Sequence, residues 1–198
     1  MIISTGPWPD VFFEIHKSER AQKIVRNLLD FARKSEIESD AHQVPDIIED
    51  TLRPATSQIK LAKVKITGKL ASNLPAVYGD RRQLEQVFLN IVLNALDAMP
   101  TGGTLTISCG TTADRESACV EFADSGVGIP EQSIADIFTP FFTTKPDAKG
   151  TGLGLSVSLG IIRRHGGDIK VSSEVGKGTT FSVFLPVAKV PADFSVEP

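Results

Sequence analysis

Three clusters of closely spaced glycines in the second half of the chain could hold an anion. Glycine lets the backbone N–H groups of a loop approach phosphate oxygens, and a helix that starts at the loop adds a favourable dipole. The middle cluster leads into an apolar helical pattern, but it lacks the Gly-Lys-Ser/Thr of a Walker loop, and no strand leads directly into it as in a dinucleotide fold. Each cluster by itself is more typical of a turn than of a ligand site. The clusters are Gly126-Val-Gly128, Gly150-Thr-Gly152-Leu-Gly154 and Gly176-Lys-Gly178.

Two amide side chains and one aromatic, threonine-rich string accompany these glycines. Asn90 and Asn94 are four residues apart, so they share one face of a long predicted helix. An amide oxygen is a hard ligand that suits Mg²⁺ without adding net charge. The string Phe138-Thr-Pro-Phe-Phe-Thr-Thr-Lys145 opens a polar loop that reaches Lys149. Its three phenylalanines are interpreted either as core residues or as a hinge that repacks when the loop closes, and both can hold at once.

The order of these pieces resembles the histidine-kinase branch of the GHKL ATPases, the family that includes gyrase, the Hsp90 chaperone and MutL. The resemblance runs from Asp80 to Pro186, more than half of the chain. The strings NALDAMP…GGTL and PFFTTK are most similar to those of nitrogen-regulator-type sensor kinases. The segment ERAQKIVRNLLDFAR, which begins at Glu19, resembles the second helix of that family's dimerisation hairpin.

The resemblance implies roles for four polar residues. Asn94 is expected to hold Mg²⁺, and Asp124 to accept a hydrogen bond from the adenine amino group, with the glycines behind it leaving room for the ring. Thr179 is expected either to support that carboxylate or to bind adenine through water. At the position of Asn90, hydrolysing relatives have a glutamate that acts as a general base. Because an amide cannot take a proton from water, the site is expected to hold ATP for transfer rather than hydrolyse it quickly.

The implied cofactors are ATP and Mg²⁺. Lys145 is the preferred phosphate contact because it ends the PFFTTK string, whereas Lys149 is either a second contact or simply solvated. Asp97 departs from the family pattern, since many relatives have a basic residue there, near the phosphates. The predicted catalytic residues are Asn90, Asn94 and Lys145. The predicted nucleotide-binding residues are Asn94, Asp124, Gly126, Gly128, Ile129, Thr143, Thr144, Lys145, Gly150, Thr151, Gly152, Leu153, Gly154, Leu155 and Thr179.

No histidine of this chain fits the phosphoryl acceptor of the family, which is followed directly by Glu or Asp. His16 and His42 precede lysine and glutamine instead, and His165 ends a helix in a His-Gly-Gly capping context. The first hairpin helix is therefore expected to be missing. The chain is predicted to be the catalytic piece of a longer sensor kinase, which transfers the γ-phosphoryl group of ATP to a histidine outside this segment.

The expected partners are the histidine-bearing dimerisation domain of the same parent protein and a response-regulator receiver domain, with a homodimer in the full-length protein. A related anti-sigma-factor kinase would phosphorylate a partner serine, and the long helix ahead of the domain argues against it. A non-catalytic nucleotide-binding or docking module stays open, although Asn94 and Asp124 are both present. A hydrolysing clamp like gyrase is disfavoured by Asn90.

Helical and strand patterns alternate along the chain. An amphipathic helix is predicted over 11–34, and a second over 44–60 with Pro45 in its first turn, where a missing N–H costs nothing. Asp80 is the predicted N-cap of a helix that runs to about Met99, with Gln83 in capping-box position. Further predictions are a strand over 63–70, paired strands over 104–110 and 118–123, a helix over 153–165, and paired strands over 168–173 and 179–186.

These elements predict an α+β two-layer sandwich, in which helices pack on one face of a mixed sheet, preceded by a long N-terminal helix. This is the fold expected of a GHKL (Bergerat) ATP-binding domain. The predicted organisation is a lead-in plus hairpin helix over 1–43, an ATP-binding catalytic domain over 44–188, and a flexible tail over 189–198.

Composition narrows the class of protein. With 41% hydrophobic and 23% charged residues among 198, the chain is typical of a soluble globular protein. A net charge of −3 argues against a general nucleic-acid binder. No apolar run approaches the roughly 20 residues of a membrane span, and no signal-peptide pattern opens the chain. Cys109 and Cys119 show no metal-site spacing, so both are expected to be reduced, in a cytoplasmic protein or the cytoplasmic part of a larger sensor.

Overall fold

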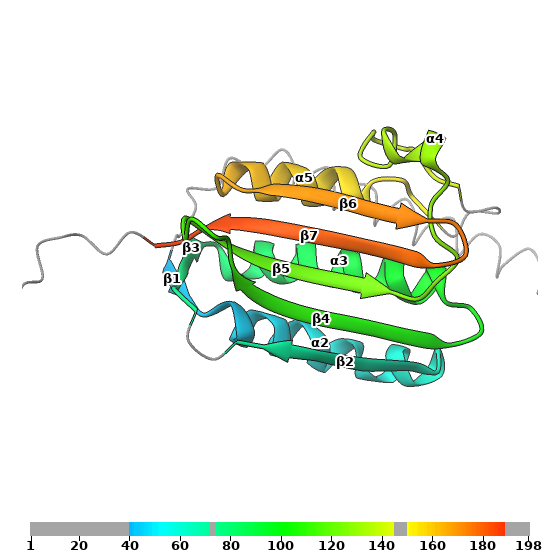
Figure 1. Cartoon of the computed structure of the whole chain (residues 1–198), viewed down its shortest axis with the longest axis horizontal. Helices are drawn as coiled ribbons and strands as arrows, with labels where there is room; N and C mark the ends of the chain where they lie inside the picture. Colours follow the sequence, from blue (N-terminus) through cyan, green and yellow to red (C-terminus); the bar gives the residue numbers. More distant parts are fainter. Residues whose placement is uncertain (1–39, 72–73, 145–149, 189–198) are drawn as a thin grey trace, which may run out of the picture.

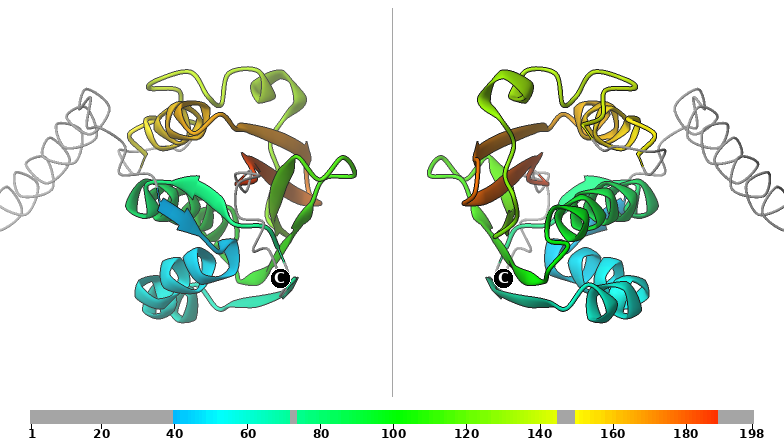
Figure 2. Two further views of the ribbon diagram at one scale, coloured as in Figure 1. Left: turned by 90° about the vertical axis from the view of Figure 1, so that its left-hand side faces the viewer. Right: turned by 90° about the vertical axis from the view of Figure 1, so that its right-hand side faces the viewer.

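The structure is a computed structural model that describes residues 40–71, 74–144 and 150–188. These residues form two layers, a five-stranded sheet and the helices that cover one of its faces (Figures 1 and 2). The helix predicted over 11–34 and the predicted tail lie outside the described residues. The elements are β1 (Asp40–His42), α2 (Val44–Leu61), β2 (Val64–Leu70), β3 (Val77–Gly79), α3 (Arg81–Ala98), β4 (Gly103–Thr111), β5 (Ser117–Asp124), α4 (Glu131–Ile134), α5 (Gly154–Arg164), β6 (Asp168–Glu174) and β7 (Gly178–Pro186).

The strand order of the large sheet is β2-β4-β5-β7-β6. β2 runs parallel to β4 and the other pairs are antiparallel, so the predicted mixed sheet is confirmed. β7 lies between β5 and β6, which places Asp124 at the end of β5 opposite Thr179 at the start of β7. The three-residue strands β1 and β3 pair with each other and were not predicted, because they are too short to show an alternating pattern.

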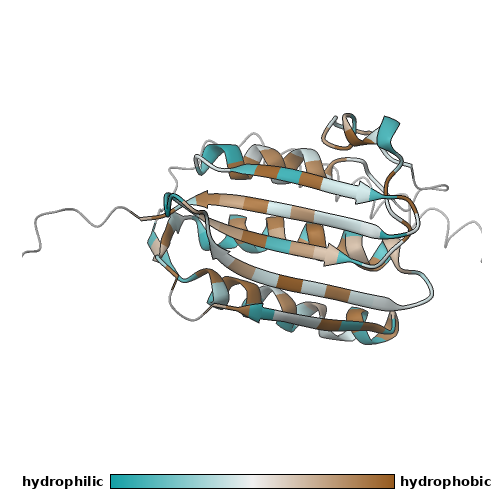
Figure 3. Ribbon diagram, in the orientation of Figure 1, coloured by the Kyte–Doolittle hydropathy of each residue, from teal (hydrophilic) through white to brown (hydrophobic). Residues whose placement is uncertain are grey.

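Hydrophobic residues alternate with more polar ones along the strands (Figure 3), and this alternation separates a buried face of the sheet from an open one. On β4 and β5, Leu105, Ile107 and Phe122 are buried, whereas the neighbouring Thr106 and Glu121 are exposed. Phe122 contacts Phe88 of α3, with ring centroids 5.4 Å apart. Burial of each such side chain contributes about 1.5–3 kcal/mol. The core therefore holds α3, the helix that carries the two amides, firmly against β5.

The N-terminus of α3 is capped as predicted, but not by a reciprocal capping box. The Asp80 carboxylate accepts hydrogen bonds from the backbone N–H groups of Arg82 (2.9 Å) and Gln83 (3.2 Å). The Gln83 side chain donates to that carboxylate (2.9 Å) instead of accepting from the Asp80 N–H. The Asp80 N–H donates to Nε2 of His165, at 3.1 Å. A contact from the end of α5 thus replaces the local bond that the sequence spacing predicted.

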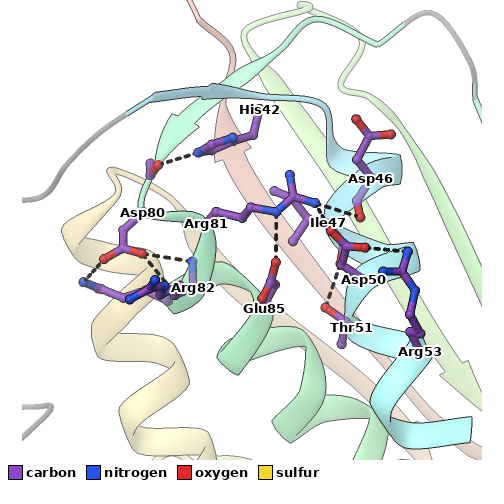
Figure 4. Close-up of polar contacts among 12 residues, drawn as sticks. His42, Asp46, Ile47, Asp50, Thr51, Arg53, Asp80, Arg81, Arg82 and Glu85 are labelled. Carbon is purple, nitrogen blue, oxygen red and sulfur yellow. Dashed lines mark hydrogen bonds and ion pairs between the residues drawn. The ribbon is translucent and has the colours of Figure 1, made fainter.

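Ionic contacts join α2 to the first turn of α3 (Figure 4). Arg81 forms ion pairs with Asp50 and, at 3.0 Å, with Glu85, and Asp50 also pairs with Arg53 at 2.8 Å. Arg53 is exposed and the other three side chains are only partly buried, so each pair contributes about 1 kcal/mol or less. The network lies at the end of the sheet next to β1 and β3, opposite the end where β5 finishes (Figure 1). Its role is to hold the helices together, away from the candidate site.

No helix within the described ranges is long and apolar enough to cross a lipid bilayer.

Candidate functional site

Asp124 is a buried carboxylate at the end of β5, with 8% of its surface exposed. Its Oδ1 atom accepts hydrogen bonds from the backbone N–H groups of Gly126 (2.8 Å) and Thr179 (3.2 Å). Among the residues that the structure describes, no donor reaches Oδ2. Burial raises the pKa of the Asp124 carboxyl, and the two N–H donors oppose that rise. The carboxylate therefore offers one acceptor to a ligand.

The loop after Asp124 rests on α3 and on the β6–β7 turn. The Val127 N–H donates to the carbonyl of Ala98 at 3.0 Å, and a Cβ on Gly126 would lie 2.6 Å from that same oxygen. Gly128 has φ +74°, and a Cβ there would lie 2.2 Å from the carbonyl oxygen of Glu174. These glycines let the backbone of the loop lie directly against the backbone of Ala98 and of Glu174. They hold the loop after Asp124 against Ala98, which lies one turn of α3 beyond Asn94. Whether they also make room for a ring stays a prediction.

Gly178, at the start of β7, has no room for a side chain. It has φ +110°, and a Cβ would lie 1.9 Å from the carbonyl oxygen of Asp124. Gly178→Ala is expected to lower the free energy of unfolding by about 2 kcal/mol or more, because it adds backbone strain and a clash. The measurement is urea unfolding. Gly110→Ala is the matched control, since a Cβ there meets nothing within 4 Å, and it should stay within about 0.5 kcal/mol of the parent. Equal losses in both variants would contradict this account of Gly178.

Thr179 is 4% exposed and hydrogen-bonded to a serine that the sequence did not single out. Its hydroxyl lies 2.9 Å from Oγ of Ser173 on β6. That Oγ also accepts the Ile129 N–H at 2.8 Å and donates to the carbonyl of Gly178 at 3.0 Å. A signal was present in the sequence, because Ser173 follows Ile169 and Val171 at the spacing of one strand face. A serine in line with two apolar residues indicates a specific polar contact.

Asn90 and Asn94 lie on the part of α3 that faces the start of α5. The Asn90 Nδ2 atom donates to the carbonyl of Gly154 (3.4 Å) and to the hydroxyl of Ser158 (3.3 Å). Ser158 is fully buried and was another residue that the sequence reading missed. Asn94 is half-buried one turn further along. Asn90 thus acts as a hydrogen-bond donor that joins two helices, a role that a carboxylate could not fill.

The middle glycine cluster is held against the aromatic string. The Phe141 N–H donates to the carbonyl of Gly152 at 2.9 Å, and both residues have positive φ, +69° and +66°. Phe141 is 64% exposed, whereas Phe138 and Phe142 pack against the core. Two of the three phenylalanines therefore pack against the core, and of the three only Phe141 combines a positive φ with high exposure, as expected of a hinge residue. α5 begins directly afterwards at Gly154, with no side-chain cap on its N-terminus.

The remaining predicted residues are distributed around this site. Gly150, Thr151 and Leu155 lie half-buried beside the start of α5, and Leu153 is buried. Thr143 and Thr144 are exposed, and Lys145 and Lys149 lie outside the described residues. Within the described ranges, no group of three or more His, Cys, Asp or Glu residues could hold a metal ion. The thiols of Cys109 and Cys119 are both free, as predicted.

This combination defines a class of protein, an ATP-binding domain built from one mixed sheet, one layer of helices and glycine loops at one end. The chain belongs to the histidine kinase-, DNA gyrase B- and HSP90-like ATPases, whose family model matches residues 79–189. The resemblance drawn from the glycine clusters and the asparagines is therefore confirmed at the level of the family.

The relatives with the same organisation are sensor kinases. The chain is 38% identical to sensor kinase CckA of Brucella abortus over 92% of its own length, and 36% identical to sporulation kinase E of Bacillus subtilis over 89%. It spans only 21% and 24% of those two proteins. Among solved structures, the nucleotide-free catalytic domain of histidine kinase ThkA matches with 30% identity and a TM-score of 0.67, over 76% of this chain and 98% of that domain. Full-length ShkA in complex with AMPPNP has the same fold, with a TM-score of 0.77 at 22% identity.

Proposed function

We propose that this chain binds ATP together with Mg²⁺ and transfers the γ-phosphoryl group to a histidine outside the segment, as the catalytic domain of a two-component sensor kinase. The observation that carries the proposal is the Asp124 carboxylate. One of its oxygens is held by two backbone N–H groups, and the other is left to accept a donor such as the adenine amino group. The loop that follows Asp124 contacts Ala98, one turn of α3 beyond Asn94.

The donor set also fits Mg²⁺ in the manner expected for a nucleotide-bound ion. Mg²⁺ prefers oxygen ligands and is commonly held by few protein groups together with substrate phosphates. The described residues contain no carboxylate cluster that could hold the ion without a nucleotide. The Asn94 amide oxygen is the proposed protein ligand, with phosphate oxygens completing the coordination. The bound ion would neutralise charge on the transferred group.

The chemistry of the Asn90 side chain favours transfer of the γ-phosphoryl group over hydrolysis of ATP. Its Nδ2 atom is a hydrogen-bond donor toward α5, and an amide has no capacity to accept a proton from water. Without a general base at this position, water is a poor acceptor of the phosphoryl group. Phosphoryl transfer depends mainly on positioning of the reactants and neutralisation of charge. A histidine imidazole from another domain can therefore accept the phosphoryl group without a general base at Asn90.

The proposed partners are the histidine-bearing hairpin of the parent protein, in a homodimer, and a response-regulator receiver domain that takes the phosphoryl group from the histidine. The relatives named as sensor kinases are several times longer than this chain, which supports a parent with further domains. The solved structure of histidine kinase ThkA in complex with response regulator protein TrrA shares this fold, with a TM-score of 0.76. A cytoplasmic location is part of the same proposal.

The test is phosphoryl transfer in trans. The chain is incubated with γ-labelled ATP, Mg²⁺ and a separately produced dimerisation hairpin that carries the acceptor histidine. Label is expected on the hairpin, stable to alkali and lost in acid, and absent from the chain incubated alone. His165 supports the second expectation, because it is bonded through both ring nitrogens, to the Asp80 N–H and the Ile161 carbonyl. Acid-stable label on a serine, or label on this chain alone, would contradict the proposal.

A further inference from the structure

We propose that Ser173 is a positioning residue for nucleotide selection, because it fixes the proton of the Thr179 hydroxyl and leaves only acceptor atoms beside the purine 6-position. The inference rests on the proposed function, since it assumes that the site next to Asp124 holds ATP. It starts from three polar atoms that surround the Ser173 hydroxyl, each within hydrogen-bond distance.

The proton of Ser173 can be assigned by elimination. A hydroxyl has one hydrogen to donate and two lone pairs to accept with. The Ile129 N–H, 2.8 Å away, can only donate to Ser173, and the Gly178 carbonyl, 3.0 Å away, can only accept from it. The Ser173 hydrogen therefore goes to Gly178. The remaining lone pair of Ser173 faces the Thr179 hydroxyl at 2.9 Å, so Thr179 must be the donor in that contact.

The orientation of the Thr179 hydroxyl affects the face of the sheet that carries Asp124. Thr179 stands directly opposite Asp124 in the β5–β7 register, and residues opposed in this way place their side chains on the same face. With its proton engaged by Ser173, Thr179 Oγ1 offers only lone pairs. The Asp124 Oδ2 atom next to it is also an acceptor without a donor among the described residues. Thr179 Oγ1 and Asp124 Oδ2 thus both present acceptors, and neither offers a proton to a ligand.

Such a pair of acceptors favours an amino group and disfavours a carbonyl. The amino group of adenine donates to a carboxylate directly, and a water molecule can donate both to Thr179 and to a ring nitrogen. A purine with a 6-carbonyl would bring an acceptor against acceptors and leave it unsatisfied. If Ser173 were absent, the Thr179 hydroxyl could rotate and donate to that carbonyl. Ser173 therefore acts on selectivity through Thr179 rather than by touching the base.

The experiment compares the affinities of the chain for ATP and for inosine triphosphate, which differs from ATP by the carbonyl and the ring N–H that accompanies it. Binding is measured by calorimetry with Mg²⁺ present. Ser173→Ala is expected to lower the ratio of ATP to inosine triphosphate affinity by roughly tenfold. Ser172→Ala is the matched control, because this neighbouring serine is exposed on the other face of β6, and it should leave the ratio unchanged. Ser173→Thr keeps the hydroxyl and should restore the ratio.

A second pair of variants separates this role from simple support of the loop. In a Thr179→Val background, Ser173→Ala should no longer change the ratio, because the hydroxyl through which it acts is gone. If Ser173→Ala does not fold, Thr179→Val should lower the ratio and Thr179→Ser should keep it. Equal weakening of both nucleotides by Ser173→Ala, or an unchanged ratio in Thr179→Val, would overturn the inference. Failure of the unmodified chain to bind ATP would overturn the proposed function itself, and the inference with it.

Discussion

Asp124→Asn is expected to weaken ATP binding by about tenfold to a hundredfold, which corresponds to about 1–3 kcal/mol for an unsatisfied buried polar partner. The two backbone N–H groups at Oδ1 require an acceptor, so the amide oxygen will take that place. The amide NH₂ then replaces the free oxygen and faces the adenine amino group, donor against donor. The measurement is calorimetry with ATP and with inosine triphosphate, whose carbonyl should now be accepted. Unchanged preference for ATP would remove Asp124 from the site.

Asp124→Asn also has a predicted effect on the free energy of unfolding, and this effect is the control for the binding measurement. Burial raises the pKa of Asp124 in the folded state above its ordinary value near 3.9, so the ionised form is disfavoured by folding. That cost is present above the raised pKa and disappears as the pH falls below the ordinary value. Asp124→Asn should therefore unfold at the same or a higher urea concentration than the parent at neutral pH. The advantage should shrink in acid. A loss of both stability and ATP binding would point to a misfolded loop instead.

Asn94→Ala is expected to reduce phosphoryl transfer to a supplied histidine hairpin by at least about a hundredfold. Loss of a metal ligand removes several kcal/mol of charge stabilisation, and each 1.36 kcal/mol is a factor of ten. Asn94 is half-buried, whereas its neighbours Ile91 and Ala95 form the core face of α3, so the helix should stay packed. The assay is initial-rate transfer from γ-labelled ATP over a range of Mg²⁺ concentrations.

The control for this variant is on the same helix. Gln86 is half-buried two turns before Asn94, and Gln86→Ala should leave transfer unchanged. Nucleotide binding with Mg²⁺ chelated should be similar in the parent and in Asn94→Ala, since the amide acts through the ion. Parent-like transfer in Asn94→Ala would exclude Asn94 as the ligand. A variant that unfolds would show instead that the amide is a structural residue of α3.

Asn90 shows how one side chain can serve both the fold and the proposed reaction. Its amide donates to the first turn of α5, at Gly154 and Ser158, and so aligns the helix that follows the middle glycine cluster. A glutamate at this place would face the Gly154 carbonyl, an acceptor, with an acceptor of its own. The contact thus gives a structural reason for an amide here, and the loss of a general base follows from the same choice.

Local signals in the sequence were sufficient to predict the longer elements of the described chain and the class of protein. The Asp80 cap, the apolar face of α3 and the alternation along β4, β5, β6 and β7 depend on neighbouring residues, and each appears in the structure close to its predicted bounds. Membership of the ATPase family was also evident, because the glycine clusters and Asp124 stand in a specific order along the chain. The order of motifs along the chain can be read from the sequence without knowledge of the fold.

Contacts between distant segments were decided only by the tertiary structure. The pairing of β5 with β7 puts Thr179 opposite Asp124, and the hydroxyl of Ser173 joins Thr179 to the backbone N–H of Ile129. The backbone N–H of Asp80, at the start of α3, donates to Nε2 of His165, 85 positions away. No local pattern encodes these partners, since a buried polar atom takes whichever partner the packing of the sheet and helices brings within about 3 Å. The sequence by itself determined which groups could bind a nucleotide, and the folded sheet decided which of their atoms remain available to do so.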